Sequence, residues 1–226
     1  MIDIKTDLRP LLGPVRDQGA RPTCLAFAAS DTHAGLREGW TPLSCEYAFF
    51  RAQQRSGRRH DQGATLSAML ETLRLDGQPA ESGWPYLDTV PDNPVHWTPP
   101  SDVGPRFGRK GGLPAIHLGP IVAALESRKP VMLLSTLSQS FFAPANEGVV
   151  DPANDEKPDP SLRHAIVAVG HGQAAGQNAI LIRNSWGAGW RVDGHAWLTE
   201  KFLKPRLFAT AILTEDIDVS TRAAAA

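Results

Sequence analysis

A cysteine near the beginning of this chain stands at the start of an expected helix. The stretch Gln18–Ser30, QGARPTCLAFAAS, runs from a turn rich in Gly and Pro into small apolar residues, and Cys24 takes the first helical position after the N-cap candidate Thr23. The N–H groups and the dipole at a helix N-terminus stabilise a thiolate, the nucleophilic form of cysteine. Taken alone, the stretch favours the commoner role of a small core side chain.

A histidine and an asparagine in the second half of the chain could complete the chemistry of this thiol. A nucleophilic cysteine needs a base, and the base needs an orienting partner. His164 opens the expected strand HAIVAVGHG, and Asn184 in RNSWGAGW follows the expected strand AILI. The amide could hold one imidazole nitrogen and leave the other facing a thiol, with Trp186 covering that hydrogen bond. Gln18, six residues before Cys24, has an amide suited to an oxyanion hole.

The elements that must position these residues read as helices first and strands later. Helical patterns cover Cys24 to about Glu38, PLSCEYAFFRAQQR and TLSAMLETLRLDG. A Pro-rich segment, QPAESGWPYLDTVPDNPVHWTPPSDVG, is expected to wrap the surface without regular helix. After a short helix in GPIVAALESRKP, strands are expected in VMLLSTL, HAIVAVGHG, AILIRNSWG and HAWLTEKFL. This order predicts an α+β protein with two lobes.

Other residues of reactive type receive structural interpretations. Cys45 is expected to be a core thiol, Glu46 a charge on the surface of its helix, and the run GRKGG (108–112) a turn. His171 and His195 lie near glycines and are expected in turns between strands. The cysteines and histidines lack the paired spacing of a zinc site, so neither a metal nor a cofactor is expected.

Composition and charge exclude several function classes. A formal net charge of −1 gives no bulk attraction to nucleic acid or an anionic membrane. No apolar run approaches the ~20 residues of a membrane span, and the N-terminal segment lacks the apolar core of a secretory signal. Two cysteines make no disulfide framework. We therefore expect a cytoplasmic location, with export without a cleaved signal peptide as the alternative.

The blocks DQGARPTCLAFA, HAIVAVGHG and IRNSWGAGW resemble, in order and spacing, three signature blocks of the papain-like cysteine peptidases. His164 follows Cys24 by 140 residues, within the ~130–150 residues typical of papain-type enzymes. Asn184 follows Cys24 by 160 residues, slightly beyond that window. The resemblance extends from about Val15 to Leu198, and ESGWPY resembles a segment of bacterial members.

The resemblance implies a role for each matching residue of the catalytic group. Cys24 would be the nucleophile, His164 its acid and base, and Asn184 the residue that orients the imidazole. Gln18 and the backbone N–H of Cys24 would bind the oxyanion, and Trp186 would shield the bond between His164 and Asn184.

Two further residues receive substrate-binding roles from the same resemblance. Gly63, in DQGATLSAMLETLRLDG, would offer backbone hydrogen bonds to an extended peptide, and Leu162 would line the pocket for the second residue before the scissile bond. Two residues depart from the family pattern. Arg21 stands where secreted members place a disulfide cysteine, and Leu25 replaces the aromatic residue after the nucleophile.

The fold implied is the papain-like two-lobe α+β fold, with the active-site cleft between a helical N-terminal lobe and a β-barrel-like C-terminal lobe. We expect a single domain over 1–220, with the helical lobe at about 15–110 and the β lobe at about 111–215, and a tail at 221–226. Because Gln18 and Cys24 come so early, we also expect no inhibitory prosegment, in either a mature fragment or a constitutively assembled enzyme that is controlled in another way.

The function expected from this resemblance is peptide-bond hydrolysis through a thioester acyl-enzyme, in an endopeptidase rather than an exopeptidase. The partners would be peptide or protein substrates, with a protein inhibitor or regulator as a further candidate. Two alternatives stay open. An acyl-transfer enzyme of transpeptidase type uses the same thiol chemistry, but usually has aspartate where Asn184 stands. A catalytically silent binding module would lack a catalytic residue, whereas all four are present.

Overall fold

The computed structural model describes residues 2–143, 148–174 and 176–219, so the expected tail lies outside the described residues. The chain divides into two compact units. One, here called the strand unit, comprises Met1–Asp17 and Leu113–Ile212, and the other, the helix unit, comprises Gln18–Gly112 and Leu213–Ala226. Helices and a mainly antiparallel sheet together confirm the α+β class.

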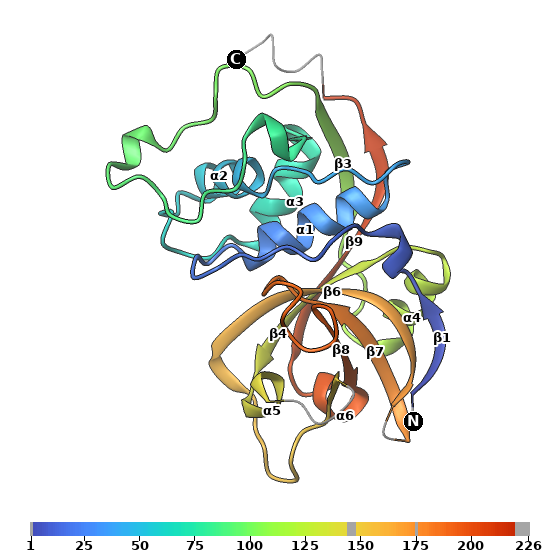
Figure 1. Ribbon diagram of the computed structural model, residues 1–226. Coiled ribbons are helices and arrows are strands. Elements are labelled where there is room, and N and C mark those ends of the chain that lie inside the picture. The colour runs from blue at the N-terminus through green and yellow to red at the C-terminus, as the bar shows by residue number, and fades with distance from the viewer. Residues whose placement is uncertain (1, 144–147, 175, 220–226) are drawn as a thin grey trace. The chain divides into compact units, whose positions relative to one another are not determined.

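The helix unit is built on three helices (Figure 1). Its elements are α1 (Cys24–Gly35), α2 (Cys45–Ser56), α3 (Leu66–Leu75), β2 (Gln78–Pro79), η2 (Glu81–Gly83), η3 (Pro94–His96) and β3 (Arg106–Gly112), with the last residues of β9 (Leu207–Ile217). Ser44 and Thr65 cap α2 and α3 by accepting hydrogen bonds from Tyr47 N and Ala68 N. Gly57, with φ of 62°, ends α2 in the left-handed conformation that glycine adopts without strain.

Helix α1 is the central helix of its unit. Every residue from Leu25 to Gly35 is buried, and α1 packs against both α2 and α3. Its many small residues suit burial on all sides, which explains why the sequence shows little helical amphipathicity. Thr23 occupies the N-cap position, but its side chain makes no capping hydrogen bond.

Strand β3 corrects one sequence expectation. The run GRKGG was expected to form a turn, but residues 106–112 form a strand that pairs with β2. Its glycines serve close packing, because a Cβ on Gly108 would lie 2.7 Å from the Ile217 carbonyl oxygen. A Cβ on Gly111 would lie 2.6 Å from the Leu70 side chain. The turn prediction was wrong because glycine marks close approach as well as chain reversal.

The strand unit is a mainly antiparallel sheet with the order β9-β4-β6-β7-β8-β5, and β1 pairs with β6 (Figure 1). Only β5 and β8 run parallel among these pairs. Besides β9, its elements are β1 (Asp3–Asp7), η1 (Arg9–Leu11), α4 (Leu118–Glu126), β4 (Val131–Leu137), α5 (Gln139–Phe142), β5 (Val149–Val150), β6 (Asp159–Ala174), β7 (Gln177–Arg183), β8 (His195–Thr199) and α6 (Glu200–Leu203).

The core of the strand unit follows the two-residue period of its strands. Alternate apolar residues of β4, β6, β7 and β8 point into one cluster with residues of α4, α5 and α6. Phe141 and Phe202 are completely buried in this cluster. These strands give His164, in β6, a rigid position.

The long strand β6 also places His171. The strands expected in HAIVAVGHG and at the start of HAWLTEKFL are confirmed at both histidines, so the expectation of turns around His171 and His195 was wrong. His171 lies inside β6 and His195 begins β8. The neighbouring glycines have a packing role. A Cβ on Gly170 would lie 2.4 Å from the Thr6 carbonyl oxygen, and one on Gly172 would lie 2.2 Å from that of Asp3. Glycine therefore lets β1 approach β6.

Candidate active site

The strand unit holds an imidazole–amide pair. His164 Nε2 lies 2.7 Å from Asn184 Oδ1, and both side chains are buried. Asn184 Oδ1 also accepts a hydrogen bond from the backbone N–H of Ser185 at 2.9 Å, while Asn184 N donates to the Gly194 carbonyl at 2.9 Å. These contacts fix the amide with its oxygen toward the imidazole.

The pair determines which nitrogen of His164 carries the proton. An amide oxygen only accepts hydrogen bonds, so Nε2 must be the donor. The neutral ring then has its lone pair on Nδ1. Burial lowers the pKa of His164 to about 4, and the hydrogen bond to Asn184 acts in the opposite direction. At neutral pH this imidazole is therefore an uncharged base.

Aromatic rings surround the imidazole. The ring of Trp186 lies 4.8 Å from that of His164, and Phe141 lies 6.1 Å from it. Phe142 stacks on Trp186 at 5.7 Å, and Trp190 meets both Phe141 and Trp186. The structure thus places Trp186 beside the imidazole. Trp186 is held there by its contact with Phe141, which is fully buried.

The helix unit holds the thiol and the amide of the predicted oxyanion site. Cys24 is the first residue of α1 and is half-buried, and neither cysteine is in a disulfide. In the loop before it, Gln18 Nε2 donates to the Arg21 carbonyl at 2.9 Å, and so does Thr23 N at 2.8 Å. The Arg21 carbonyl therefore orients the Gln18 amide and shapes the turn that leads to Cys24.

Tyr86 contacts the loop before Cys24, and no role for it was expected from the sequence. Its hydroxyl donates to the Gln18 carbonyl at 2.7 Å and lies 2.9 Å from Thr23 Oγ1. Burial raises the pKa of Tyr86, so its hydroxyl keeps its proton well above neutral pH. The segment ESGWPY, which resembles a segment of bacterial family members, was the signal that could have identified it.

A buried ion pair fixes the same loop from its other side. Arg21 Nη1 and Nη2 donate to the two carboxylate oxygens of Glu46 at 2.6 and 2.9 Å, and both side chains are buried. Glu46 also accepts hydrogen bonds from Trp97 Nε1 at 2.6 Å and from the backbone N–H of Leu87 at 3.0 Å. The expectation that Glu46 is a surface charge was wrong, because the Pro-rich segment covers this face of α2.

The two substrate-binding candidates lie in different units. Gly63 is close to the loop before Cys24, since a Cβ on it would lie 3.9 Å from the Pro22 carbonyl oxygen. Arg58 donates a hydrogen bond to the Gly63 carbonyl. Leu162 lies in β6, two residues before His164, and its side chain is exposed.

Among the residues that the structure describes, no group of three His, Cys, Asp or Glu side chains could hold a metal ion. Within the same residues, no helix is long and apolar enough to cross a membrane.

Comparisons with known proteins agree with the sequence resemblance. Residues 110–204 match the model of a family described as papain family cysteine protease. Cathepsin J of Mus musculus is 29% identical over 194 residues, covering 80% of this chain and 55% of that protein. Papain of Carica papaya is 26% identical over 186 residues, covering 80% of this chain and 50% of that protein. The chain spans about half the length of the curated relatives it matches.

Solved structures show the same fold. Xylellain, a cysteine protease from Xylella fastidiosa, superimposes with a TM-score of 0.75 at 20% identity, covering 95% of this chain and 87% of that one. The Carica candamarcensis cysteine protease CMS1MS2, in complex with E-64, gives 0.73 at 19% identity and covers 92% of this chain and 97% of that one. The papain-like fold predicted from the sequence is confirmed.

Proposed function

We propose that this chain, which is similar to the papain-like cysteine peptidases, hydrolyses peptide bonds with Cys24, His164 and Asn184 as its catalytic residues. The observation that carries the proposal is the hydrogen bond of 2.7 Å between His164 Nε2 and Asn184 Oδ1. It leaves Nδ1 of a buried neutral imidazole as the basic atom, which is the form a general base needs.

In the proposed reaction, the Cys24 thiol gives its proton to His164 Nδ1, and the thiolate attacks the carbonyl carbon of the substrate. The imidazolium then protonates the leaving amine as the C–N bond breaks, and a thioester remains on Cys24. His164 next takes a proton from water, whose oxygen attacks the thioester. The tetrahedral intermediate formed by this attack then collapses: its C–S bond breaks, the proton returns to sulfur, and the carboxylic acid is released.

The oxyanion would be bound by the Gln18 amide and the backbone N–H of Cys24. The position of Cys24 at the start of a helix of 12 residues supports this assignment, because the first N–H groups of a helix have no intrahelical acceptor. The Gln18 amide is preorganised by its hydrogen bond to the Arg21 carbonyl. Donors fixed before the reaction stabilise developing charge at little reorganisation cost.

We propose endopeptidase action on peptide or protein substrates, with Gly63 and Leu162 as substrate contacts. Exopeptidase action requires a segment that blocks one end of the cleft, and the Pro-rich segment is long enough to be a candidate. The packing of its Trp84 and Trp97 edge-on against Phe50 of α2, at 5.4 and 5.0 Å, supports the endopeptidase proposal, while Tyr86 of the same segment contacts the Gln18 loop. A cytoplasmic location stays part of the proposal.

Cleavage of an internally quenched peptide blocked at both ends, with products identified by mass, tests this function. Cys24→Ala should abolish cleavage and keep the fold, and His164→Ala should do nearly the same. Cys45→Ala, a matched change at a fully buried thiol, should keep the parental rate. Equal cleavage by Cys24→Ala would refute the assignment, and transfer of the acyl group to an added amine in preference to water would favour the acyl-transfer alternative.

A further inference from the structure

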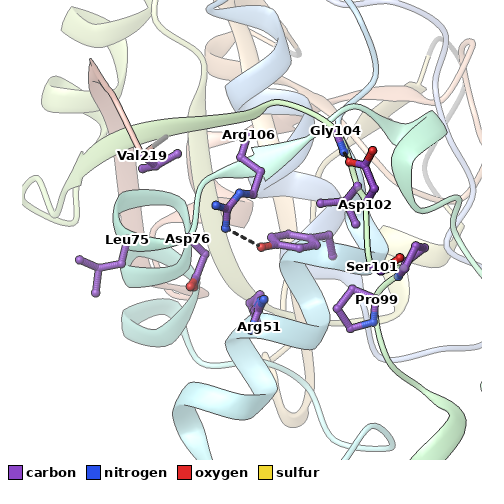
Figure 2. Close-up of a pocket in the computed structure, with 12 residues that line it drawn as sticks. Arg51, Leu75, Asp76, Pro99, Ser101, Asp102, Gly104, Arg106 and Val219 are labelled. Carbon is purple, nitrogen blue, oxygen red and sulfur yellow. Dashed lines mark hydrogen bonds between the residues drawn. The ribbon is translucent and has the colours of Figure 1, made fainter. Parts of the chain in front are cut away.

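A polar pocket of about 530 Å³ lies within the helix unit, and none of the candidate catalytic or substrate-binding residues lines it. Its walls come from α2, the end of α3, the segment 99–104, the start of β3 and Val219 (Figure 2). The volume falls in the range of clefts that hold small organic ligands. No role in peptide hydrolysis accounts for this pocket.

Two arginines line the pocket without a carboxylate partner of their own. Within the described residues, neither Arg51 nor Arg106 makes a salt bridge. Of the pocket's two acidic groups, Asp76 is paired with Arg55, from which it accepts hydrogen bonds of 2.9 and 2.8 Å. Asp102 accepts one hydrogen bond from the backbone N–H of Gly104 at 2.8 Å and keeps its negative charge. Arg51, Arg106 and Asp102 together leave the pocket with one net positive charge.

Both guanidinium groups are held in place. Arg51 lies over the ring of Tyr47 at 5.3 Å and that of Phe50 at 5.9 Å, and its Nη1 donates to Gln54 at 3.0 Å. Its Nε is buried and has no hydrogen-bond partner among the described residues. Arg106 Nη1 donates to the Tyr47 hydroxyl oxygen at 3.4 Å, and a dashed line from Arg106 marks this hydrogen bond in Figure 2. Because these contacts limit their motion, the two cations lose little entropy on binding an anion.

We propose that this pocket binds a small organic anion, with an apolar body and a carboxylate or phosphate group. Guanidinium groups pair with both anions through charge-assisted hydrogen bonds. Leu75, Pro99 and Pro100 offer apolar surface to the rest of the ligand. The proposal is independent of peptide hydrolysis, so either can fail without the other.

The test is a titration of the full chain, followed through its backbone amides by NMR. The probes are phenyl phosphate, phenylacetate, the neutral analogue phenylacetamide and inorganic phosphate. We expect saturable shifts at the amides of residues 101–104 with one or both aromatic anions, much weaker binding of phenylacetamide, and weaker binding at high salt. The tighter of the two aromatic anions identifies the preferred acidic group.

Charge-removing variants localise the binding. Arg51→Gln and Arg106→Gln should each weaken the preferred anion about tenfold or more, the usual loss for a charge-assisted hydrogen bond. Arg74→Gln, the same change at an exposed residue of α3 outside the pocket, should leave affinity unchanged. Equal binding of phenylacetamide and phenylacetate by the parental protein would overturn the proposal, and that comparison needs no variant. Binding of inorganic phosphate alone would also overturn it.

Discussion

Removing Arg21 should destabilise the helix unit strongly, because it leaves a buried carboxylate without its cation. Glu46 is completely buried and accepts four hydrogen bonds, two of them from Arg21. Breaking a buried ion pair from one side costs about 3–5 kcal/mol. We therefore expect Arg21→Met, which keeps the length of the side chain, to lower the free energy of unfolding by about that amount.

A second change should recover part of this loss. In Arg21→Met with Glu46→Gln, no charge remains buried, and the amide oxygen can still accept from Trp97 Nε1. The residual cost is that of imperfectly satisfied polar groups, about 1–3 kcal/mol. The double variant should therefore be more stable than Arg21→Met, although it carries one more substitution.

Urea denaturation followed by tryptophan fluorescence measures both effects. Trp97 contacts Glu46 directly, so its emission reports on the region that changes. The matched control is Arg59→Met, which removes a pair with Asp61 whose side chains are 75% and 49% exposed. That control should cost less than about 1 kcal/mol. A loss below 1 kcal/mol in Arg21→Met, or a double variant less stable than the single one, would refute the reasoning.

Three further predictions concern the histidines and the sheet. His164→Ala should lower kcat/KM about 10²–10⁴-fold, and Asn184→Ala should retain partial activity, both measured with the quenched peptide. Burial, with the nearby charge of Arg109, lowers the pKa of His33 to about 3, so the unfolded chain binds the proton more readily. Stability should fall by about 3–5 kcal/mol as pH drops from about 6.5 toward 3, and less in His33→Gln, by urea denaturation across pH. Gly170→Ala should lower the midpoint temperature of thermal unfolding, because the added Cβ would clash with the Thr6 carbonyl oxygen. Gly189→Ala should leave that midpoint unchanged, because the position of its Cβ is open.

The catalytic candidates in the strand unit were accessible from the sequence because short blocks carry them. His164 lies within β6 and Asn184 directly follows β7, each in a recognisable block, and their hydrogen bond follows from the pairing of these two strands. Gln18 and Cys24 are likewise neighbours in one loop. Local sequence is enough where the partners share an element or adjacent strands.

The buried ion pair between Arg21 and Glu46 could not be predicted from local sequence. Arg21 and Glu46 are 25 residues apart, and helical periodicity cannot show that a Pro-rich segment will cover Glu46. The pocket beside Arg51 and Arg106 combines α2, α3, the segment 99–104, β3 and Val219, so no single stretch of sequence contains it. Tertiary packing decides both features, and it also decides that GRKGG is a strand.

Labelling with an epoxysuccinyl thiol inhibitor, followed by intact mass and peptide mapping, tests the central claim most directly. We predict one inhibitor per chain, bound to Cys24 and not to Cys45, with the rate of labelling strongly reduced in His164→Ala. Labelling of Cys45, no labelling of the folded protein, or a rate at Cys24 that is unchanged in His164→Ala would contradict the account.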